Sequence, residues 1–253
     1  MKIFDFHVHP SYNFYKPAPN PQKFREGLEK YGITRCSGSA ICQEMYNRPI
    51  EEYPAHLERM NREAFAMQQA LPDFFVAGIH VHPSFVDWSC EQIEQYAKKG
   101  VRLIGELVPS SSAWESYAPK NLAPIMALAA EYGMIVSTHP KRPPMMEEFV
   151  RLCPKDLKIV FAHLDGYGYF ENEIELMRRY DNVFCDISYH GADRQGMLRE
   201  ALDLVGKDRI LYGSDYPGYD SDEILRVVLA DDITEDEQEA VLYRNAERLL
   251  RLD

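Results

Sequence analysis

Long apolar runs are missing from this 253-residue sequence, and no stretch approaches the roughly 18 apolar residues of a membrane-spanning helix. The first residues lack a signal-peptide-like apolar run and lead straight into a charged and aromatic segment. Cysteine is scarce, and no two cysteines form a C-x-x-C pair. An odd, scattered set is typical of free thiols in a reducing compartment, so we expect a cytoplasmic protein. The five cysteines are Cys36, Cys42, Cys90, Cys153 and Cys185.

Basic residues are in the minority, with 28 Lys and Arg against 40 Asp and Glu and a net charge of −12. This balance argues against a nucleic-acid partner and against an anionic membrane surface, whereas a small-molecule substrate remains compatible with it. Linkers rich in proline or serine and low-complexity segments are also missing. We therefore expect residues 1–253 to form one domain, which the 45% of hydrophobic residues can supply with a large core.

Short apolar segments alternate with helical patterns along the whole chain. Repeated strand–helix units imply parallel strands with right-handed crossovers, and eight units in about 250 residues favour a (β/α)8 TIM-type barrel. A doubly wound α/β sheet is the alternative, although it usually has fewer strands. Strands are expected at 3–8, 36–42, 74–79, 101–107, 134–138, 157–162, 183–187 and 209–212. Helices are expected at 24–31, 51–71, 89–99, 121–132, 145–152, 170–180, 195–205, 222–229 and 235–250.

Two histidines separated by one residue, His7 and His9, end the first expected strand. Alternate residues of a strand point to the same face, so both imidazoles aim at one point, and Pro10 then ends the strand. Paired imidazoles suit zinc and similar divalent metals. The motif alone also arises by chance, but further candidates follow other strands. They are Glu106, His139, His163 and Asp215, all at the carboxyl ends where active sites of such barrels lie.

The motifs at 7–9, 138–139, 161–166 and 211–217 resemble the amidohydrolase superfamily. They are most similar to its amidohydrolase-related (amidohydrolase 2) branch, which also holds metal-dependent decarboxylases. The likeness extends to Asn245-Ala246, so it covers nearly the whole chain. The resemblance implies one or two divalent metal ions, commonly zinc. By the same resemblance the ligands would be His7, His9, His139, His163 and Asp215.

Glu106 follows Ile104-Gly105, a stretch that is also similar to TatD-type hydrolases. Two-metal members of the superfamily often place a bridging carboxylate at this point, and an oxygen ligand between two cations offsets their repulsion. Glu106 is therefore a candidate bridging ligand. The alternative is a glutamate that forms an ion pair beside the site. If Glu106 points into the barrel, strand parity also turns Arg102 inward, which is costly unless Arg102 is paired.

These residues predict a metal-dependent hydrolase of a small-molecule amide, ester, lactone or related bond. A divalent cation lowers the pKa of bound water to about 7, and Asp215 would act as general base and acid. A metal-dependent, non-hydrolytic decarboxylase is the first alternative, with one metal ion and a larger role for a cation such as Arg142. A TatD-type phosphoesterase or nuclease and a non-catalytic metal-binding barrel are further alternatives.

Four residues are candidate substrate contacts, because each follows a strand that faces the same end of the barrel: His80, Lys141, Arg142 and His190. Asp5 could orient a metal ligand or belong to a structural polar pair. Aromatic residues in the loops could line an apolar substrate, pack the loops on the barrel, or form the face of a homodimer. These are Tyr12, Tyr15, Trp114, Tyr117, Tyr167 and Tyr169.

Overall fold

The computed structural model describes residues 1–10, 20–41, 48–191 and 194–252. Cys42, Tyr12 and Tyr15 lie outside these residues. Within them the other four cysteines are free thiols. The described part of the chain contains no helix whose length and apolarity would let it cross a membrane.

Eight parallel strands form one sheet in sequence order, from β1 to β8. Beyond the regular ladders, β1 and β8 are joined through a bridge between Val8 and Tyr216 and through the bond from the Phe6 N–H to the Tyr212 carbonyl. The sheet therefore closes on itself, and the predicted TIM-type barrel is confirmed. The strands are β1 Phe4–Asp5, β2 Arg35–Gly38, β3 Phe75–Ile79, β4 Leu103–Leu107, β5 Ile135–Thr138, β6 Lys158–Phe161, β7 Val183–Asp186 and β8 Ile210–Leu211.

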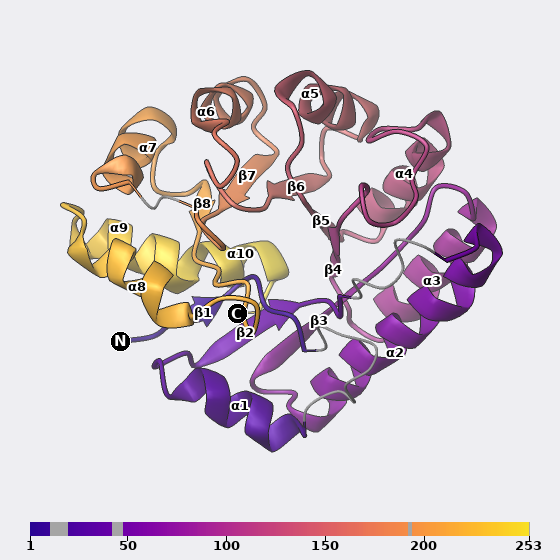
Figure 1. Cartoon of the computed structure of the whole chain (residues 1–253), viewed down its shortest axis with the longest axis horizontal. Coiled ribbons are helices and arrows are strands. Elements are labelled where there is room, and N and C mark those ends of the chain that lie inside the picture. The colour runs from indigo at the N-terminus through magenta and orange to yellow at the C-terminus, as the bar shows by residue number, and fades with distance from the viewer. Residues whose placement is uncertain (11–19, 42–47, 192–193, 253) are drawn as a thin grey trace.

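Helices surround the strands, as Figure 1 shows. Proline occupies the first turn of several of them, where its missing N–H costs nothing. Gly133 and Gly206, with φ of 62° and 79°, adopt positive φ angles just beyond two helix ends, where glycine is favoured. The α-helices are α1 Pro21–Glu29, α2 Tyr53–Ala70, α3 Val86–Ala97, α4 Ala123–Glu131, α5 Pro143–Leu152, α6 Phe170–Arg179, α7 Met197–Val205, α8 Ser221–Ala230, α9 Glu235–Glu239 and α10 Asn245–Leu250. Shorter helical turns are η2 Ile50–Glu52, η3 Lys120–Leu122 and the π-helical η4 Ala240–Arg244.

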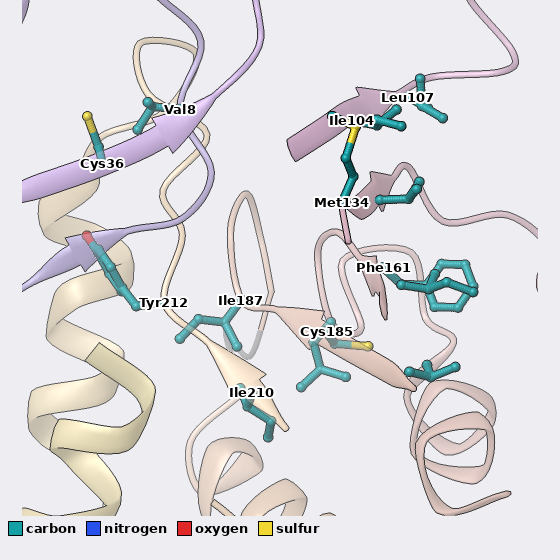
Figure 2. Close-up of a cluster of buried hydrophobic side chains, with 14 of the residues drawn as sticks. Val8, Cys36, Ile104, Leu107, Met134, Phe161, Cys185, Ile187, Ile210 and Tyr212 are labelled. Carbon is teal, nitrogen blue, oxygen red and sulfur yellow. The ribbon is translucent and has the colours of Figure 1, made fainter. Parts of the chain in front are cut away.

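Buried apolar side chains form two layers, one inside the barrel and one between strands and helices. Figure 2 shows part of the outer layer, with Ile104, Phe161, Cys185 and Ile210 on β4, β6, β7 and β8. The inner layer lies near the starts of the strands, and α10 contributes Ala246, Leu249 and Leu250 to it, so α10 seals that end. The other residues of this layer are Phe6, which follows β1, and the strand residues Phe4, Val76, Leu103, Ile135, Val160, Phe184 and Leu211.

Each observed strand is shorter than the segment expected for it, the first two by the most, and the expected last helix is interrupted. The first strand was expected over 3–8, but the chain bends at Phe6 and only Phe4–Asp5 pair regularly. The second was expected over 36–42, but it ends at Gly38. A Cβ at position 38 would lie 1.7 Å from the Val8 carbonyl oxygen, so only glycine allows the two segments to approach this closely. The helix expected over 235–250 contains η4 between α9 and α10.

Candidate metal centre

The six predicted metal ligands lie together at the carboxyl edge of the barrel, the end at which the strands finish. His7 and His9 follow β1, and their Nε2 atoms are 3.2 Å apart. Asp215, which follows β8, places Oδ1 3.0 Å from His9 Nε2 and 3.9 Å from His7 Nε2. His139 follows β5 and His163 follows β6, with ring centroids 5.0 Å apart.

Glu106, on β4, lies between the two pairs of histidines. Its Oε2 is 3.5 Å from His7 Nε2 and 3.9 Å from His9 Nε2. Its Oε1 is 2.8 Å from His139 Nδ1 and 3.4 Å from His163 Nε2. One carboxylate therefore contacts both histidine pairs with different oxygens, which is the arrangement that a bridging ligand needs.

The inward direction of Glu106 depends on an irregularity in β4. Gly105 has a φ of 94°, and the pairing with β5 shifts register between Ile104 and Leu107. Ile104 and Leu107 both pack in the outer layer, so the strict two-residue alternation fails between them. The expectation that Arg102 would turn inward with Glu106 is therefore wrong. Arg102 Nη1 instead donates to the Tyr132 carbonyl, 2.7 Å away.

Hydrogen-bond acceptors behind the imidazoles fix their orientation. His7 Nδ1 lies 2.9 Å from Asp186 Oδ2, and His9 Nδ1 lies 2.8 Å from the Ser39 carbonyl oxygen. Because a carboxylate and a carbonyl only accept, these two Nδ1 atoms carry the protons. His7 and His9 therefore direct the lone pairs of their Nε2 atoms toward each other and toward Asp215.

This donor set fits a divalent cation. Lone pairs on nitrogens 3.2 Å apart, with carboxylate oxygens beside them, repel unless a positive charge lies among them. His7, His9 and Glu106 each offer a ligand atom within 4.8 Å of the others, and so do Glu106, His139 and His163. Nitrogen and oxygen donors of this kind suit zinc and manganese, and the described residues supply enough of them for one ion or two.

The electrostatics of the site favour positive charge. Burial disfavours a charged His7, but the charges of Asp186 and Glu106 outweigh it and raise the pKa of His7 well above its usual range. Burial likewise disfavours an ionised Glu106, but His7 and His139 hold the pKa of this carboxyl well below its usual range. The residues around the site therefore stabilise a cation in its centre, whether it is a proton or a metal ion.

Asp186, at the end of β7, was not among the sequence-based candidates. Besides His7 Nδ1, it accepts the backbone N–H of His163 (3.2 Å) and of Ser188 (3.0 Å). Ser188 Oγ in turn lies 2.8 Å from His163 Nδ1. The strand-end rule that selected the other residues applies to Asp186 equally, so the signal was present in the sequence.

Asp5 connects the segment that carries His7 to the segment that carries Asp215. It accepts the N–H of His7 (3.2 Å) and of Ser214 (3.0 Å), and so ties β1 to the segment that carries Asp215. Burial raises the pKa of Asp5 to about 7, although the bonds from Ser214 and His7 oppose that rise. The contacts make Asp5 a residue that orients its neighbours rather than one that faces the donor set.

The candidate substrate contacts have different surroundings. His80 is buried, its Nε2 lies 2.7 Å from the Ala40 carbonyl, and burial lowers its pKa to about 4. His190 is exposed and packs against the rings of Tyr189 and Tyr219. Lys141 and Arg142 follow His139 in the loop before α5, where Arg142 is exposed at the helix start.

Some of the aromatic residues in the loops are buried in packing contacts, and another lies beside the site. Tyr117 is buried and donates to the His139 carbonyl (2.6 Å), and Trp114 is buried against His82. Tyr169 precedes α6 as its N-cap residue. Tyr167 is different, because its ring centroid is 5.2 Å from that of His139 and 45% of its surface is exposed.

Comparisons with known proteins show the family of this chain. The family model described as amidohydrolase matches residues 5–252. The chain belongs to the amidohydrolase 2 family. A search among curated proteins found no match.

Several solved structures share the fold of this family member over nearly the full length of both chains. The 2,6-dihydroxybenzoate decarboxylase from Rhizobium has a TM-score of 0.78 at 14% identity, with 99% of each chain covered. The 5-carboxyvanillate decarboxylase from Novosphingobium aromaticivorans, complexed with manganese and 4-hydroxy-3-methoxy-5-nitrobenzoic acid, has a TM-score of 0.72 at 16% identity and covers 98% of this chain and 96% of its own. An uncharacterized TIM-barrel protein from Bordetella bronchiseptica has a TM-score of 0.76 at 19% identity, with 99% of each chain covered.

Proposed function

We propose that this protein is a divalent-metal-dependent, non-hydrolytic decarboxylase of small carboxylic acids that carry an aromatic or unsaturated group. The observation that carries the proposal is the convergence of His7, His9 and Asp215 at the carboxyl edge of an amidohydrolase 2 barrel. Solved structures similar over the whole chain include decarboxylases of aromatic acids, one of them with bound manganese. This support is better for a decarboxylase than for the hydrolase that the motifs suggest first.

The proposed roles follow from the donor atoms. His7, His9, His163 and Asp215 would hold the metal, with Glu106 and His139 completing the set. A bound divalent cation would supply Lewis acidity, which draws electron density from the carbon that carries the carboxylate. Lys141 and Arg142, which follow His139, are the proposed contacts for the negative charge of the substrate.

Asp215 is the proposed proton donor and acceptor. When the bond to the carboxyl carbon breaks, its electron pair stays on the substrate carbon and carbon dioxide leaves. The carbon then takes a proton, which Asp215 can hold within reach of the site. Asp186 and the Ser39 carbonyl keep His7 and His9 in place during these steps, through the bonds to their Nδ1 atoms.

Hydrolysis of an amide, ester or lactone is the second candidate, and the position of Glu106 favours it. Glu106 contacts both histidine pairs with separate oxygens, which suits a bridge between two ions. In that case Asp215 would take a proton from water and return it to the leaving group. The acidic net charge of −12 disfavours a nuclease of the TatD type.

The deciding experiment combines metal counting with isotope labelling. Protein purified without chelator is analysed for zinc and manganese, then incubated with 2,6-dihydroxybenzoate and related acids in D2O. Decarboxylation predicts one ion per chain, released carbon dioxide, and one deuterium on the carbon that lost the carboxylate. Two ions per chain, no carbon dioxide with any acid, and 18O from labelled water in a cleaved ester or amide would overturn the proposal in favour of hydrolysis.

A further inference from the structure

Three tyrosine rings form a cluster on the loops after β6, β7 and β8. The rings of Tyr167 and Tyr189 are stacked, with centroids 5.7 Å apart and planes 14° from parallel. The ring of Tyr219 meets Tyr189 edge-on, with centroids 4.5 Å apart. None of the three tyrosines belongs to the proposed ligand set.

The stacked pair borders the proposed metal ligands directly. The Tyr167 ring lies 5.2 Å from that of His139, and the Tyr189 ring lies 5.3 Å from that of His163. His163 is buried, whereas Tyr167 keeps 45% of its surface exposed. The Tyr167 ring is therefore both partly exposed to solvent and in contact with a proposed metal ligand.

The loops hold this pair in a fixed place. Tyr189 has a φ of 60°, a strained conformation for a non-glycine residue that clusters at functional sites. Gly166 lets the loop before Tyr167 fold tightly, since a Cβ there would lie 3.0 Å from the His163 Cβ and 3.3 Å from the Tyr189 ring. Asp165 accepts the N–H of Phe170 (3.0 Å) and so ties the end of the same loop to α6.

We propose that the stacked rings of Tyr167 and Tyr189 are the surface against which the planar ring of the substrate lies. The inference rests on the proposed function and adds residues that select the substrate. A planar ring stacks on an exposed aromatic face, whereas a saturated ring of similar size gains only the apolar contact. Stacking adds about 0.5–1.5 kcal/mol, which corresponds to about 2- to 10-fold in affinity.

The test compares two acids that differ in ring planarity, on protein loaded with Zn²⁺. Dissociation constants for benzoate and cyclohexanecarboxylate are measured by ligand-observed NMR. We expect the wild-type protein to prefer benzoate, and Tyr167→Ala to reduce that preference by about 2- to 10-fold. Tyr167→Phe keeps the ring and should keep the preference.

Tyr169→Ala is the matched control, because it removes a tyrosine from the same loop whose ring stacks on no other ring of the described residues, and it should leave the preference unchanged. Tyr167→Leu keeps apolar bulk without an aromatic face, and it replaces Tyr167→Ala if that variant does not fold. An unchanged preference in Tyr167→Leu or Tyr167→Ala at full zinc content would overturn the inference, since packing would then be the only role of Tyr167. A Tyr167-dependent preference without release of carbon dioxide from any acid would instead overturn the proposed reaction and leave the ring surface standing.

Discussion

At the scale of single residues, Asp186 is a buried carboxylate that contacts His7 and holds the backbone around His163. It faces His7 Nδ1 with Oδ2 and two backbone N–H groups with Oδ1. In Asp186→Asn the amide NH2 must face either the His7 N–H or the two backbone donors, so one bond set is lost. We expect metal affinity to fall about 10- to 100-fold, measured by competition with a chromogenic chelator.

Asp181→Asn is a suitable control for that measurement, because Asp181 is an exposed acid just before the same strand. It should bind metal like the wild type. Wild-type affinity in Asp186→Asn would show that the His7–Asp186 contact does not orient a ligand.

Substitution of Asp215 should lower turnover and leave the metal content nearly unchanged. Its Oδ1 lies 3.0 Å from His9 Nε2, and five other proposed ligands remain when it is changed. Asp215→Asn removes the acid–base group, so kcat should fall by about 10²- to 10⁴-fold. Elemental analysis of the same sample should find nearly unchanged metal. Turnover equal to that of the wild type would refute the assignment of Asp215 as proton donor and acceptor.

At the scale of elements, periodicity and breakers predicted most of the fold. The helix expected over 170–180 is α6 Phe170–Arg179, and the strand expected over 134–138 is β5 Ile135–Thr138. The errors arise where tertiary contacts override the pattern. The close approach of Gly38 to Val8 ends β2 early, and the irregular β4 turns Glu106 inward while Ile104 and Leu107 face outward. Neither effect can be predicted from the secondary-structure propensities of the residues concerned.

The candidate ligands were found mainly from their positions at the ends of expected strands, because a histidine or carboxylate alone is a weak signal. Each proposed ligand follows a strand or, like Glu106, lies near its carboxyl end, and parallel strands bring these ends to one edge whatever their lengths. What the sequence could not give is the partner of each ring nitrogen. Asp186, on β7, and Ser39, just after β2, contact His7 and His9 from distant parts of the sequence, so their roles emerge only once the barrel closes.

Helix α6 carries a buried acid, Glu173, that predicts a pH-dependent stability. Burial raises the pKa of Glu173 to about 8 from its ordinary 4.5, although the N–H of Asp165 opposes that rise. Below about pH 4.5 the carboxyl is protonated in both the folded and the unfolded state. As pH rises toward 8, the unfolded state releases the proton first, so this group lowers the free energy of unfolding.

Glu173→Gln should therefore melt at a higher temperature than the wild type at pH 8 and at nearly the same temperature at pH 4.5. The gain at pH 8 is on the order of a few kcal/mol, or several degrees in a thermal scan. Glu175→Gln, on the exposed face of the same helix, is the control and should change neither value. Parallel pH profiles for Glu173→Gln and the wild type would mean that Glu173 is ionised in the folded protein.

At the scale of the whole molecule, the two ends of the barrel differ in what holds them together. The end near the strand starts is filled by apolar side chains and sealed by α10. The carboxyl edge instead gathers imidazoles and carboxylates whose lone pairs converge. A cation at that edge would join distant parts of the barrel, because its proposed ligands come from β1, β4, β5, β6 and β8.

Metal removal should for this reason destabilise the entire barrel rather than one loop. A ligand at 100 times its Kd stabilises the folded state by about 2.7 kcal/mol, which is about 5–10 °C for a chain of this size. We expect a single cooperative melting transition that moves down by that amount in chelator and recovers with Mn²⁺ or Zn²⁺. Glu106→Gln should weaken the response to added metal because it removes the charge shared by both histidine pairs, whereas Glu173→Gln should respond like the wild type. Equal melting temperatures with chelator and with saturating metal would contradict a site built from these strands.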